Sequence, residues 1–339
     1  MRTIEWRKGT VVTIDQTKLP GEEVTVTIKD CNEMAEAIRT MKIRGAPLLG
    51  AAAAYGLALT AWKSKASSRE SFLSELERAA ETIRRTRPTA VNLFWALDRI
   101  LDKARKSSGN QKDLAKFVTE EAMKIADEDA AANKAIGKQG ARLINSGDVV
   151  LTHCNAGALA TVEYGTALGV IRAAWKQGKR IRVFADETRP LLQGARLTVY
   201  ELKKEGIPVT LITDGMVGFV MQKGMISKVI VGADRIVKDA VINKIGTYTV
   251  AVLAREHKVP FYVAAPTSTL DLARSSRDVV IEERNAEEVT HMGARRITAK
   301  GVNVFNPAFD ITPFKYVTAI ISEKGVFSPK SLSKYKANS

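Results

Sequence analysis

Short apolar runs alternate with helical segments in the second half of the chain, and this alternation restricts the possible folds more than any other feature. We interpret as strands the runs Val149–Thr152, Ile181–Ala185, Val209–Thr213, Lys228–Gly232 and Phe261–Ala265. Helical spacing marks Ala158–Lys176, Gly194–Lys204, Met216–Gln222 and Thr247–His257. Strand–helix alternation of this length predicts a parallel, doubly wound sheet, in which polar residues that follow the strands meet at one edge.

The first half of the chain has a different pattern. Alternating residues predict short strands at Thr3–Trp6, Val11–Ile14 and Glu23–Ile28. Helical periodicity follows at Asn32–Met41, Ala46–Trp62, Ser68–Arg85, Ala90–Lys106 and Asp113–Ile144, the last as one helix or two. At 339 residues, two domains are the better expectation. We therefore predict an α/β protein with a small β-plus-helical domain at residues 1–145 and the doubly wound domain at residues 146–339.

The composition argues for a protein of the cytoplasm. Apolar residues make up 45% of the chain, which is enough for a sizeable core, and no apolar run approaches the ~20 residues of a membrane span. The first residues carry an acid and lack the apolar centre of a signal peptide. Cys31 and Cys154 allow only one disulfide, and no Cys/His spacing resembles a zinc site. We expect neither a disulfide scaffold nor a metal.

The net charge of +15 makes anionic partners plausible without identifying them. The basic residues are spread along the chain, and no block of like charges or aromatic-rich RNA-binding sequence accompanies them. We therefore prefer a generic basic surface to a nucleic-acid site. The first strand of the second half is not followed by Gly-x-Gly-x-x-Gly, and there is no phosphate-binding loop with Gly-Lys-Ser/Thr, which argues against dinucleotides and nucleoside triphosphates.

Two residues at predicted strand ends are candidates for catalysis. Cys154 follows the run Val149–Thr152 and precedes a predicted helix, a position that favours an anion or a thiolate; the alternative is an inert core cysteine. Asp234 follows a long apolar run, where burial would keep its carboxyl protonated as a proton donor; the alternative is a salt bridge to Arg235.

Other segments could bind an anion. Arg44-Gly45-Ala46 at the start of a predicted helix is a reasonable phosphate cradle, although an ordinary helix-entry loop has the same residues. Arg87 could supply a further cation, and Asn243-Lys244 could supply hydrogen bonds and charge. Each of these signals is weak when taken alone.

Seven motifs together resemble one family. They are Ile43–Pro47, Arg87–Leu93, His153–Gly157, Ala185–Pro190, Gln193–Leu197, Gly232–Arg235 and Asn243–Tyr248. Their sequences and order are similar to those of the methylthioribose-1-phosphate isomerases, and they span nearly the whole chain. The wider family contains ribose-1,5-bisphosphate isomerases and the regulatory α, β and δ subunits of the exchange factor for translation initiation factor 2.

The resemblance implies a Rossmann-like C-terminal domain, a homodimer, a sugar-phosphate substrate and no cofactor. It also implies that Cys154 is the catalytic thiol and Asp234 the proton donor. The residues implied to bind substrate are Arg44, Gly45, Ala46, Arg87, Gln193, Asn243 and Lys244. Asp186, Glu187 and Arg189 lie in a matching motif and are expected to hold the site and the dimer together rather than to take part in the reaction.

Three readings of the function remain open at this point. The first is isomerisation of 5-methylthioribose 1-phosphate to 5-methylthioribulose 1-phosphate in methionine salvage, by an enediol or by hydride transfer. The second is isomerisation of ribose 1,5-bisphosphate, which needs a second cationic pocket where a methylthio group needs an apolar one. Phe94 and Trp95 could line such an apolar pocket or belong to the helix core. The third reading is a regulatory subunit without activity.

Overall fold

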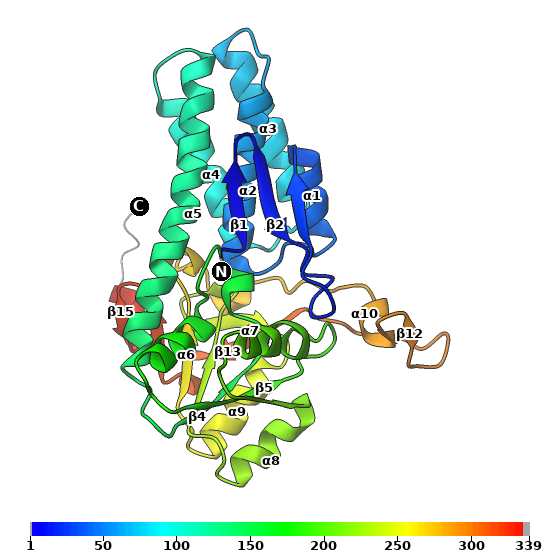
Figure 1. The fold of residues 1–339 in the computed structure, drawn as a ribbon, viewed down its shortest axis with the longest axis vertical. Coiled ribbons are helices and arrows are strands. Elements are labelled where there is room, and N and C mark those ends of the chain that lie inside the picture. Colours follow the sequence, from blue (N-terminus) through cyan, green and yellow to red (C-terminus); the bar gives the residue numbers. More distant parts are fainter. Residues whose placement is uncertain (1, 335–339) are drawn as a thin grey trace.

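The computed structural model describes residues 2–334, which form a helical part stacked on a sheet part (Figure 1). The helical part begins with an antiparallel sheet of three strands, β1 (Ile4–Arg7), β2 (Thr10–Ile14) and β3 (Thr25–Ile28). The helices that follow are α1 (Cys31–Arg39), α2 (Ala46–Lys63), α3 (Arg69–Arg84), α4 (Val91–Lys106) and α5 (Gln111–Ala141). The predicted β cap and helices are confirmed, and α5 is one long helix.

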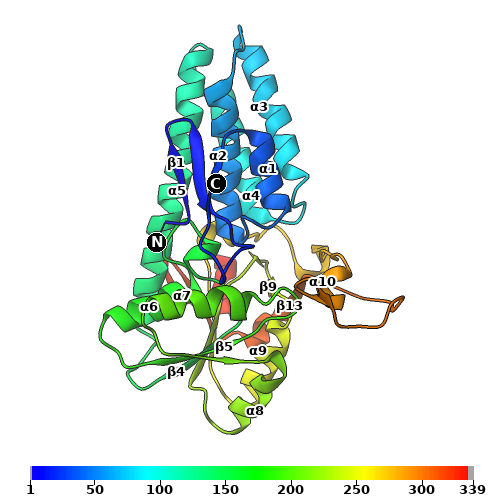
Figure 2. The same ribbon diagram turned by 45° about the vertical axis from the view of Figure 1, so that its right-hand side comes forward.

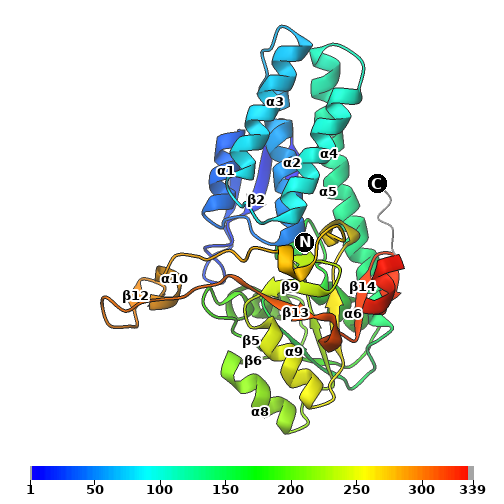
Figure 3. The same ribbon diagram turned by 180° about the vertical axis from the view of Figure 1, so that it is seen from behind.

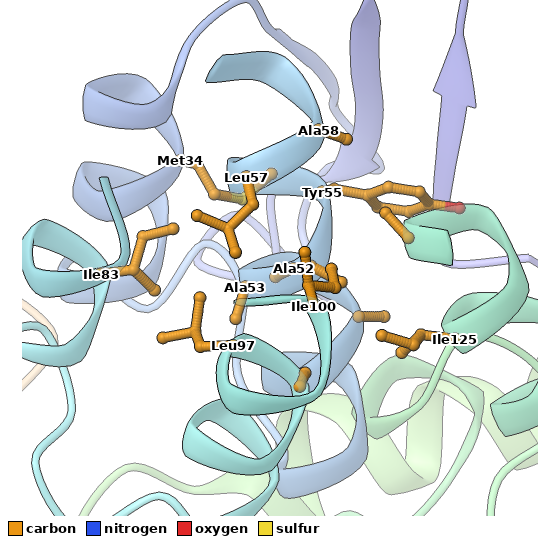
Figure 4. Close-up of a cluster of buried hydrophobic side chains, with 14 of the residues drawn as sticks. Met34, Ala52, Ala53, Tyr55, Leu57, Ala58, Ile83, Leu97, Ile100 and Ile125 are labelled. Carbon is orange, nitrogen blue, oxygen red and sulfur yellow. The ribbon is translucent and has the colours of Figure 1, made fainter. Parts of the chain in front are cut away.

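Helix α2 is the centre of the helical part because its small residues let other helices approach on every side. Nearly all of its residues are buried, as expected for a helix that is apolar all round. Figure 4 shows Ala53 and Leu57 of α2 among side chains from α1, α3 and α4. At Gly56 a Cβ would lie 2.4 Å from Ile83 Cδ1 of α3. This packing fixes where the N-terminus of α2 points.

The large sheet of the second part has the strand order β15-β14-β10-β7-β4-β5-β6. Its strands are β4 (Val149–Thr152), β5 (Arg182–Asp186), β6 (Val209–Ile212), β7 (Lys228–Val231), β10 (Phe261–Ala264), β14 (Ala319–Ser322) and β15 (Gly325–Phe327). All neighbours pair in parallel except β14 and β15. The six parallel strands have the Rossmann order: β5 and β6 are added on one side of β4, and β7, β10 and β14 are added on its other side, so the strand order reverses between β4 and β7. The predicted doubly wound sheet is confirmed.

Helices cover both faces of this sheet (Figure 2). They are α6 (Ala167–Lys176), α7 (Val199–Lys204), α8 (Val217–Gln222) and α9 (Thr247–Glu256). Successive strand residues point to opposite faces: Val150 and Ile230 pack toward α6 and α7, whereas Leu151 and Val229 pack toward α8 and α9. Burial on both faces explains why these strands are continuous apolar runs.

A second, antiparallel sheet that the sequence did not predict lies beside the large one (Figure 3). It consists of β8 (Arg235–Ile236), β9 (Ala240–Lys244) and β13 (Phe309–Pro313), in the order β13-β9-β8. The polar residues Asn243 and Lys244 end β9 although all five of its residues are buried. Because a buried strand normally reads as apolar throughout, the pattern concealed β9.

Residues 285–306 form an arm that projects from the body of the molecule (Figures 1 and 2). The arm contains α10 (Glu287–Thr290) and the hairpin of β11 (His291–Met292) and β12 (Arg295–Arg296). A bridge between Glu283 and Pro307 closes its base. The segment that leads into it, residues 279–284, is called the strap below.

Short helical turns occur elsewhere at Asp214–Met216, Thr267–Thr269, Ser276–Asp278, Phe314–Tyr316 and Pro329–Lys334.

Two predicted helices are shorter than expected. The segment Ala158–Lys176 is a 3-10 turn, η1 (Ala158–Ala160), followed by a loop and then α6. The segment Gly194–Lys204 begins as a π-helix, η2 (Gly194–Thr198), before α7. The helical spacing of apolar residues did not reveal these irregular segments, because they depend on contacts with distant buried residues that are described in the next section.

The hydrophobic cores separate within α5. One core cluster extends from Ile4 to Ala130 with Val162, and two others extend from Ile136 to Leu332. Helix α5 therefore belongs to both parts of the molecule. The domain boundary between residues 145 and 146 stays a prediction. No helix within residues 2–334 combines the length and apolar character needed to cross a membrane.

Candidate functional site

A cavity lies between the helical part and the carboxyl edge of the large sheet. Every residue predicted for the site lines it: Arg44, Gly45, Ala46, Arg87, Cys154, Gln193, Asp234, Asn243 and Lys244. Cys154 follows β4 and Asp234 follows β7, the two neighbouring strands between which the strand order reverses. Ligands of doubly wound sheets bind at that position.

Two threonines hold Cys154 in an unusual backbone conformation. Its φ is +62°, in the left-handed region that residues other than glycine seldom adopt. The Cys154 N–H donates to Thr188 Oγ1 at 2.8 Å, and Thr198 Oγ1 donates to the Cys154 carbonyl at 2.6 Å. Both threonines are completely buried. The backbone of the candidate nucleophile is therefore fixed on both sides by hydroxyl groups.

The loop after Cys154 is organised by one buried carboxylate. Glu201 of α7 accepts hydrogen bonds from the Ala158 and Leu159 N–H groups and from Asn155 Nδ2. A Cβ on Gly157 would lie 2.3 Å from the same carboxylate. Because Glu201 pairs with these groups, the chain forms η1 here rather than a long helix. The prediction of a continuous helix over Ala158–Lys176 is therefore wrong for its first part, and the helix N-terminus that was expected to favour a thiolate at Cys154 does not form there.

His153 and Asp186 form a buried ion pair behind Cys154. His153 Nδ1 lies 2.7 Å from Asp186 Oδ2, and its Nε2 lies 2.9 Å from the Ile245 carbonyl. Burial by itself would lower the pKa of His153, but Asp186 and the Ile245 carbonyl raise it to about 9. Asp186 Oδ1 also accepts from the Thr188 hydroxyl at 2.8 Å. Asp186 thus holds the site together, through Thr188 and His153.

Ligand atoms of His153, Asp186 and Asp214 all lie within 4.8 Å of one another, close enough to consider a metal site. Both nitrogens of the His153 ring are already hydrogen-bonded, to Asp186 and to the Ile245 carbonyl. The Asp214 carboxylate accepts hydrogen bonds from the backbone N–H groups of Thr188 and Arg189. A metal would have to displace these internal hydrogen bonds and the protonated ring. The donor set fits an ion pair better than a metal centre.

The wall opposite the sheet carries positive charge. Arg44 is buried and oriented by two hydrogen bonds to Asn155, at 2.7 and 2.9 Å. Gly45, with φ +100°, precedes α2, and a Cβ there would lie 2.5 Å from Ala160 Cα. This close approach brings the N-terminus of α2 to the cavity, where its dipole favours an anion. Arg87 lines the same cavity, and its Nε lies 3.7 Å from Glu282 Oε2.

Lys244 and Asn243 enter the cavity from β9. Lys244 Nζ donates to the Ala308 carbonyl at 2.6 Å and lies 4.6 Å from the centre of the Phe309 ring. Asn243 Nδ2 donates to Thr247 Oγ1 at 3.0 Å. Burial and neighbouring Arg284 lower the pKa of Lys244 to about 8. The lysine is therefore protonated at neutral pH but close to losing its charge.

Burial changes the protonation of both candidate catalytic groups. It raises the pKa of the Asp234 carboxyl, while Lys244, Arg44 and Arg87 oppose the change. It likewise raises the pKa of the Cys154 thiol against Arg44 and Lys244. Both groups retain some exposure because they face the cavity. Burial thus shifts both groups toward their protonated forms, a carboxylic acid and a thiol.

Two buried polar atoms of the cavity have no hydrogen-bond partner within the described part of the chain. They are Arg87 Nε and Gln193 Oε1. Both residues were predicted to bind substrate, and such atoms are costly unless a ligand or water pairs with them. Gln193 precedes η2, which packs so closely that a Cβ on Gly194 would lie 1.7 Å from the Asp186 carbonyl oxygen.

The sequence did not reveal Arg284 and Phe309, which also line the cavity. They lie in irregular or newly recognised structure, and no periodicity marks them; the charged run Glu282-Glu283-Arg284 was the only available signal. Of the two interpretations of Phe94 and Trp95, the wall of an apolar substrate pocket receives no support from the structure. Phe94 packs against the helical core, and Trp95 is exposed with Arg99 over its ring, so neither lines the cavity.

The arrangement suits acid-assisted chemistry on a phosphorylated small molecule. The cations and the α2 N-terminus can hold a phosphate, a protonated Asp234 can donate a proton, and the rigidly held Cys154 faces the same space.

Comparisons with known proteins agree with this chemistry. Residues 42–329 match the initiation factor 2 subunit family. Methylthioribose-1-phosphate isomerase of Geobacter metallireducens is 57% identical over 99% of this chain and 98% of its own length. The crystal structure of 5-methylthioribose 1-phosphate isomerase from Pyrococcus horikoshii is 47% identical, with a TM-score of 0.91 over 98% of this chain and 95% of that chain.

A further structure carries a different name. It is described as translation initiation factor eIF-2B, subunit delta, from A. fulgidus, and it is 53% identical with a TM-score of 0.86 over 98% of this chain and 97% of that chain. The match to the family model and the identities over nearly the whole length lead to one conclusion. The chain belongs to the initiation factor 2 subunit family, in the branch that contains the methylthioribose-1-phosphate isomerases.

Proposed function

We propose that the protein is an aldose–ketose isomerase that converts 5-methylthioribose 1-phosphate to 5-methylthioribulose 1-phosphate in methionine salvage. Relatives more than 55% identical over nearly the whole chain carry the name of this enzyme. The observation that carries the assignment to the site is the placement of Asp234, with its raised pKa, and Cys154 in one cationic cavity.

The substrate phosphate is the handle that orients the sugar. In this proposal Arg44, Arg87 and Lys244 and the first turn of α2 at Gly45 and Ala46 hold it. Lys244 and Arg87 already lie in the cavity as buried cations, and Arg87 Nε still lacks a partner. Gln193 and Asn243 would bind sugar hydroxyls. Binding energy from the phosphate then serves to align the reacting carbons.

Asp234 is proposed to open the ring. The phosphate blocks the anomeric carbon, so the sugar cannot open to an aldehyde without help from an acid. Transfer of the Asp234 proton to the ring oxygen breaks its bond to carbon 1 and leaves carbon 1 electron-poor. Burial raises the pKa of the Asp234 carboxyl, which favours the protonated form that this step requires.

Cys154 is proposed to act at carbon 2, by one of two routes. In a hydride route, hydrogen moves with its electron pair from carbon 2 to carbon 1, Cys154 lies beside the cationic intermediate, and the hydroxyl of carbon 2 gives its proton to the carboxylate that Asp234 became when it protonated the ring oxygen. In an enediol route, a Cys154 thiolate removes the proton from carbon 2, and that proton returns to carbon 1. The raised pKa of the thiol favours the hydride route, because the thiol is neutral before substrate binds.

The regulatory-subunit reading receives support from the name of the A. fulgidus structure. A binding subunit has no need of a strained, doubly tethered cysteine opposite a buried acid, and this chain has both. Catalysis therefore explains the site better.

The test is a proton NMR assay of the purified protein with 5-methylthioribose 1-phosphate in deuterated water. We expect turnover to the ketose. A hydride route leaves deuterium out of the new methylene, whereas a solvent-exchanged enediol introduces it. Failure to turn over the sugar, together with co-purification with initiation factor subunits, would overturn the proposal in favour of the regulatory role.

We further propose a homodimer that works in the cytoplasm. Exposed apolar side chains gather around the edge strand β6 and α8, where Leu211, Met216, Phe219 and Met225 are each at least 45% exposed. Such a patch is typical of an interface. The measurement is light scattering of the wild type and of Phe219→Glu, which should shift toward monomer. Both cysteines are free thiols, in keeping with a reducing compartment.

A further inference from the structure

Arg44 is held at the cavity without being neutralised. It donates to Asn155 Oδ1 at 2.7 Å and to the Asn155 carbonyl at 2.9 Å. These bonds use two of the five N–H groups of its guanidinium, and within residues 2–334 Arg44 forms no salt bridge. The orientation of Arg44 is therefore fixed, while its charge and its other donors remain available to an anion in the cavity.

Asn155 connects Arg44 to a buried carboxylate. Its Nδ2 donates to Glu201 Oε1 at 2.9 Å. A guanidinium can only donate and a carboxylate can only accept, so a side chain between them must accept at one end and donate at the other. The amide of Asn155 does both. Asn155 is 4% exposed and Glu201 is 2% exposed, so solvent does not compete for these bonds.

The same carboxylate fixes the backbone against which helix α2 packs. The Ala158 N–H donates to Glu201 Oε2 at 2.7 Å, and the Leu159 N–H donates to its Oε1 at 3.1 Å. Both residues belong to η1, which ends at Ala160. A Cβ on Gly45 would lie 2.5 Å from Ala160 Cα, so the N-terminus of α2 rests directly on η1. Glu201 thus sets the position of this helix end as well.

Glu201 is itself anchored in the sheet part of the molecule. Arg172 of α6 lies 3.2 Å from Glu201 Oε2, and its Nε donates to Glu205 Oε2 at 2.5 Å. Arg172 is only 4% exposed. A Cβ on Gly157 would lie 2.3 Å from Glu201 Oε1, so the loop passes close to the carboxylate. A residue of the sheet part therefore determines the geometry of cationic groups that the helical part supplies.

We propose that Glu201 is a positioning residue for substrate binding. Through Asn155 and η1 it holds Arg44 and the first turn of α2 in the geometry that binds the sugar phosphate. The inference rests on the proposed function, which assigns the phosphate to these groups. Glu201 does not line the cavity and acts only through its neighbours. This separation matters, because a carboxylate in direct contact with Arg44 would compete with the phosphate for its donors.

The test variant is Glu201→Gln, which keeps the size of the side chain but removes one acceptor. Oε1 accepts from Asn155 and Leu159, and Oε2 accepts from Ala158 and Arg172. Either orientation of a glutamine amide would therefore place an NH₂ group against donors. The link to Arg44 or the link to η1 must then break.

The first readout is the affinity for inorganic phosphate, measured on the full-length protein by phosphorus NMR titration. Glu201→Gln should raise this Kd at least about tenfold, in line with the loss of hydrogen bonds to a charged group. KM for 5-methylthioribose 1-phosphate should rise by a similar factor, while kcat changes less than about threefold, as expected when uniform binding is lost. The hydroxyls of Thr188 and Thr198, which hold Cys154, are unchanged in this variant.

The second readout is a double-mutant cycle with Arg44→Ala. Because Glu201 is proposed to act largely through Arg44, Glu201→Gln should lower kcat/KM by less than about threefold in the Arg44→Ala enzyme, against at least about tenfold in the wild type. Equal factors in the two backgrounds would overturn the proposal, since Glu201 would then support the fold independently of Arg44.

The matched control is Glu121→Gln. Glu121 of α5 is also a buried carboxylate, 6% exposed, and it accepts from Arg99 and Lys103 at 2.7 Å each, but it does not line the cavity or contact Asn155. Its replacement should lower the thermal transition and leave the phosphate affinity and KM unchanged. The control thereby separates loss of a buried charge from loss of positioning.

Asn155→Ala is the second variant if Glu201→Gln does not fold, as judged by its thermal transition. It breaks the link to Arg44 and retains the bonds of Glu201 to η1, and it should raise the Kd for phosphate at least about tenfold. Wild-type phosphate affinity in the folded variant would overturn the positioning role while the proposed function stands. A wild type that binds phosphate but turns over no sugar would overturn the proposed function, and the phosphate affinities would still decide the role of Glu201.

Discussion

Thr188→Val should impair the reaction by releasing the backbone of Cys154. Valine keeps the shape of threonine but removes the hydroxyl that accepts from the Cys154 N–H at 2.8 Å and donates to Asp186 at 2.8 Å. Position 188 is completely buried, so the Cys154 N–H would lose its partner away from solvent. An unpaired buried donor costs about 1–3 kcal/mol, similar to the ~1–3 kcal/mol needed to hold a strained backbone conformation. Without the hydroxyl, the left-handed conformation at Cys154 loses its support.

The assay separates positioning from stability. We expect kcat to fall by about 10- to 100-fold, because a displacement of about 1 Å in a reacting group can cost ~100-fold. KM should change less than about threefold, since the residues proposed to hold the phosphate are untouched. The free energy of unfolding, measured in urea, should fall by about 1–3 kcal/mol. Thr188→Ser retains the hydroxyl and should restore most of kcat.

The control for this prediction is Thr312→Val. Thr312 is a completely buried threonine of β13 whose hydroxyl has no partner within the described residues, and it does not line the cavity. Its replacement should leave kcat unchanged. A Thr188→Val enzyme with wild-type kcat and reduced stability would refute the reasoning, because the hydroxyl would then stabilise the fold without positioning the thiol.

Four further predictions concern the chemistry and the packing of the site. Asp234→Asn should lower kcat by at least ~100-fold, the lower end of the effect of losing a general acid, while the affinity for product, measured by calorimetry, stays within about threefold. Cys154→Ser should also lose most of the activity. A fully active serine enzyme would show that the thiol takes no part in the reaction. Because the pKa of Lys244 is lowered to about 8, its ammonium loses its proton as pH rises through that value, so kcat/KM should fall above pH 8. Lys244→Arg should remove this decline, and an unchanged pH profile would assign it to another group. Gly194→Ala should lower the free energy of unfolding, measured in urea, by ~1–3 kcal/mol or more, because the new Cβ would lie 1.7 Å from the Asp186 carbonyl oxygen. The control is Gly215→Ala, whose Cβ would meet nothing within 4 Å and whose stability should differ little from that of the wild type.

The residues of the site could be predicted because strand ends and flexible loops have clear local signals. Cys154 and Asp234 each end a short apolar run, and parallel strands of a doubly wound sheet bring such ends to one edge. Arg44 and Arg87 were found mainly because their motifs resemble those of a known family. The structure places all of them on one cavity.

The residues that hold the site in place could not be predicted in the same way. Glu201 is an ordinary helix residue in the sequence, yet its carboxylate shapes the loop after Cys154 from 43 positions away. Arg284 and Phe309 belong to segments without periodicity. Their contacts depend on how the strap and β13 pass the cavity, and local sequence does not record such long-range contacts.

The sequence by itself determined the alternation of buried strands and helices, because burial on both faces demands continuous apolar runs and burial on one side of a helix demands periodicity. It thereby determined the doubly wound sheet and the strand ends at which Cys154 and Asp234 lie. Only the tertiary structure decided their protonation and conformation. Burial raises the pKa of both groups, and two buried hydroxyls hold Cys154 at a positive φ. These properties arise from distant residues that meet only when the chain is folded, since solvent exclusion and hydrogen-bond geometry are features of packing.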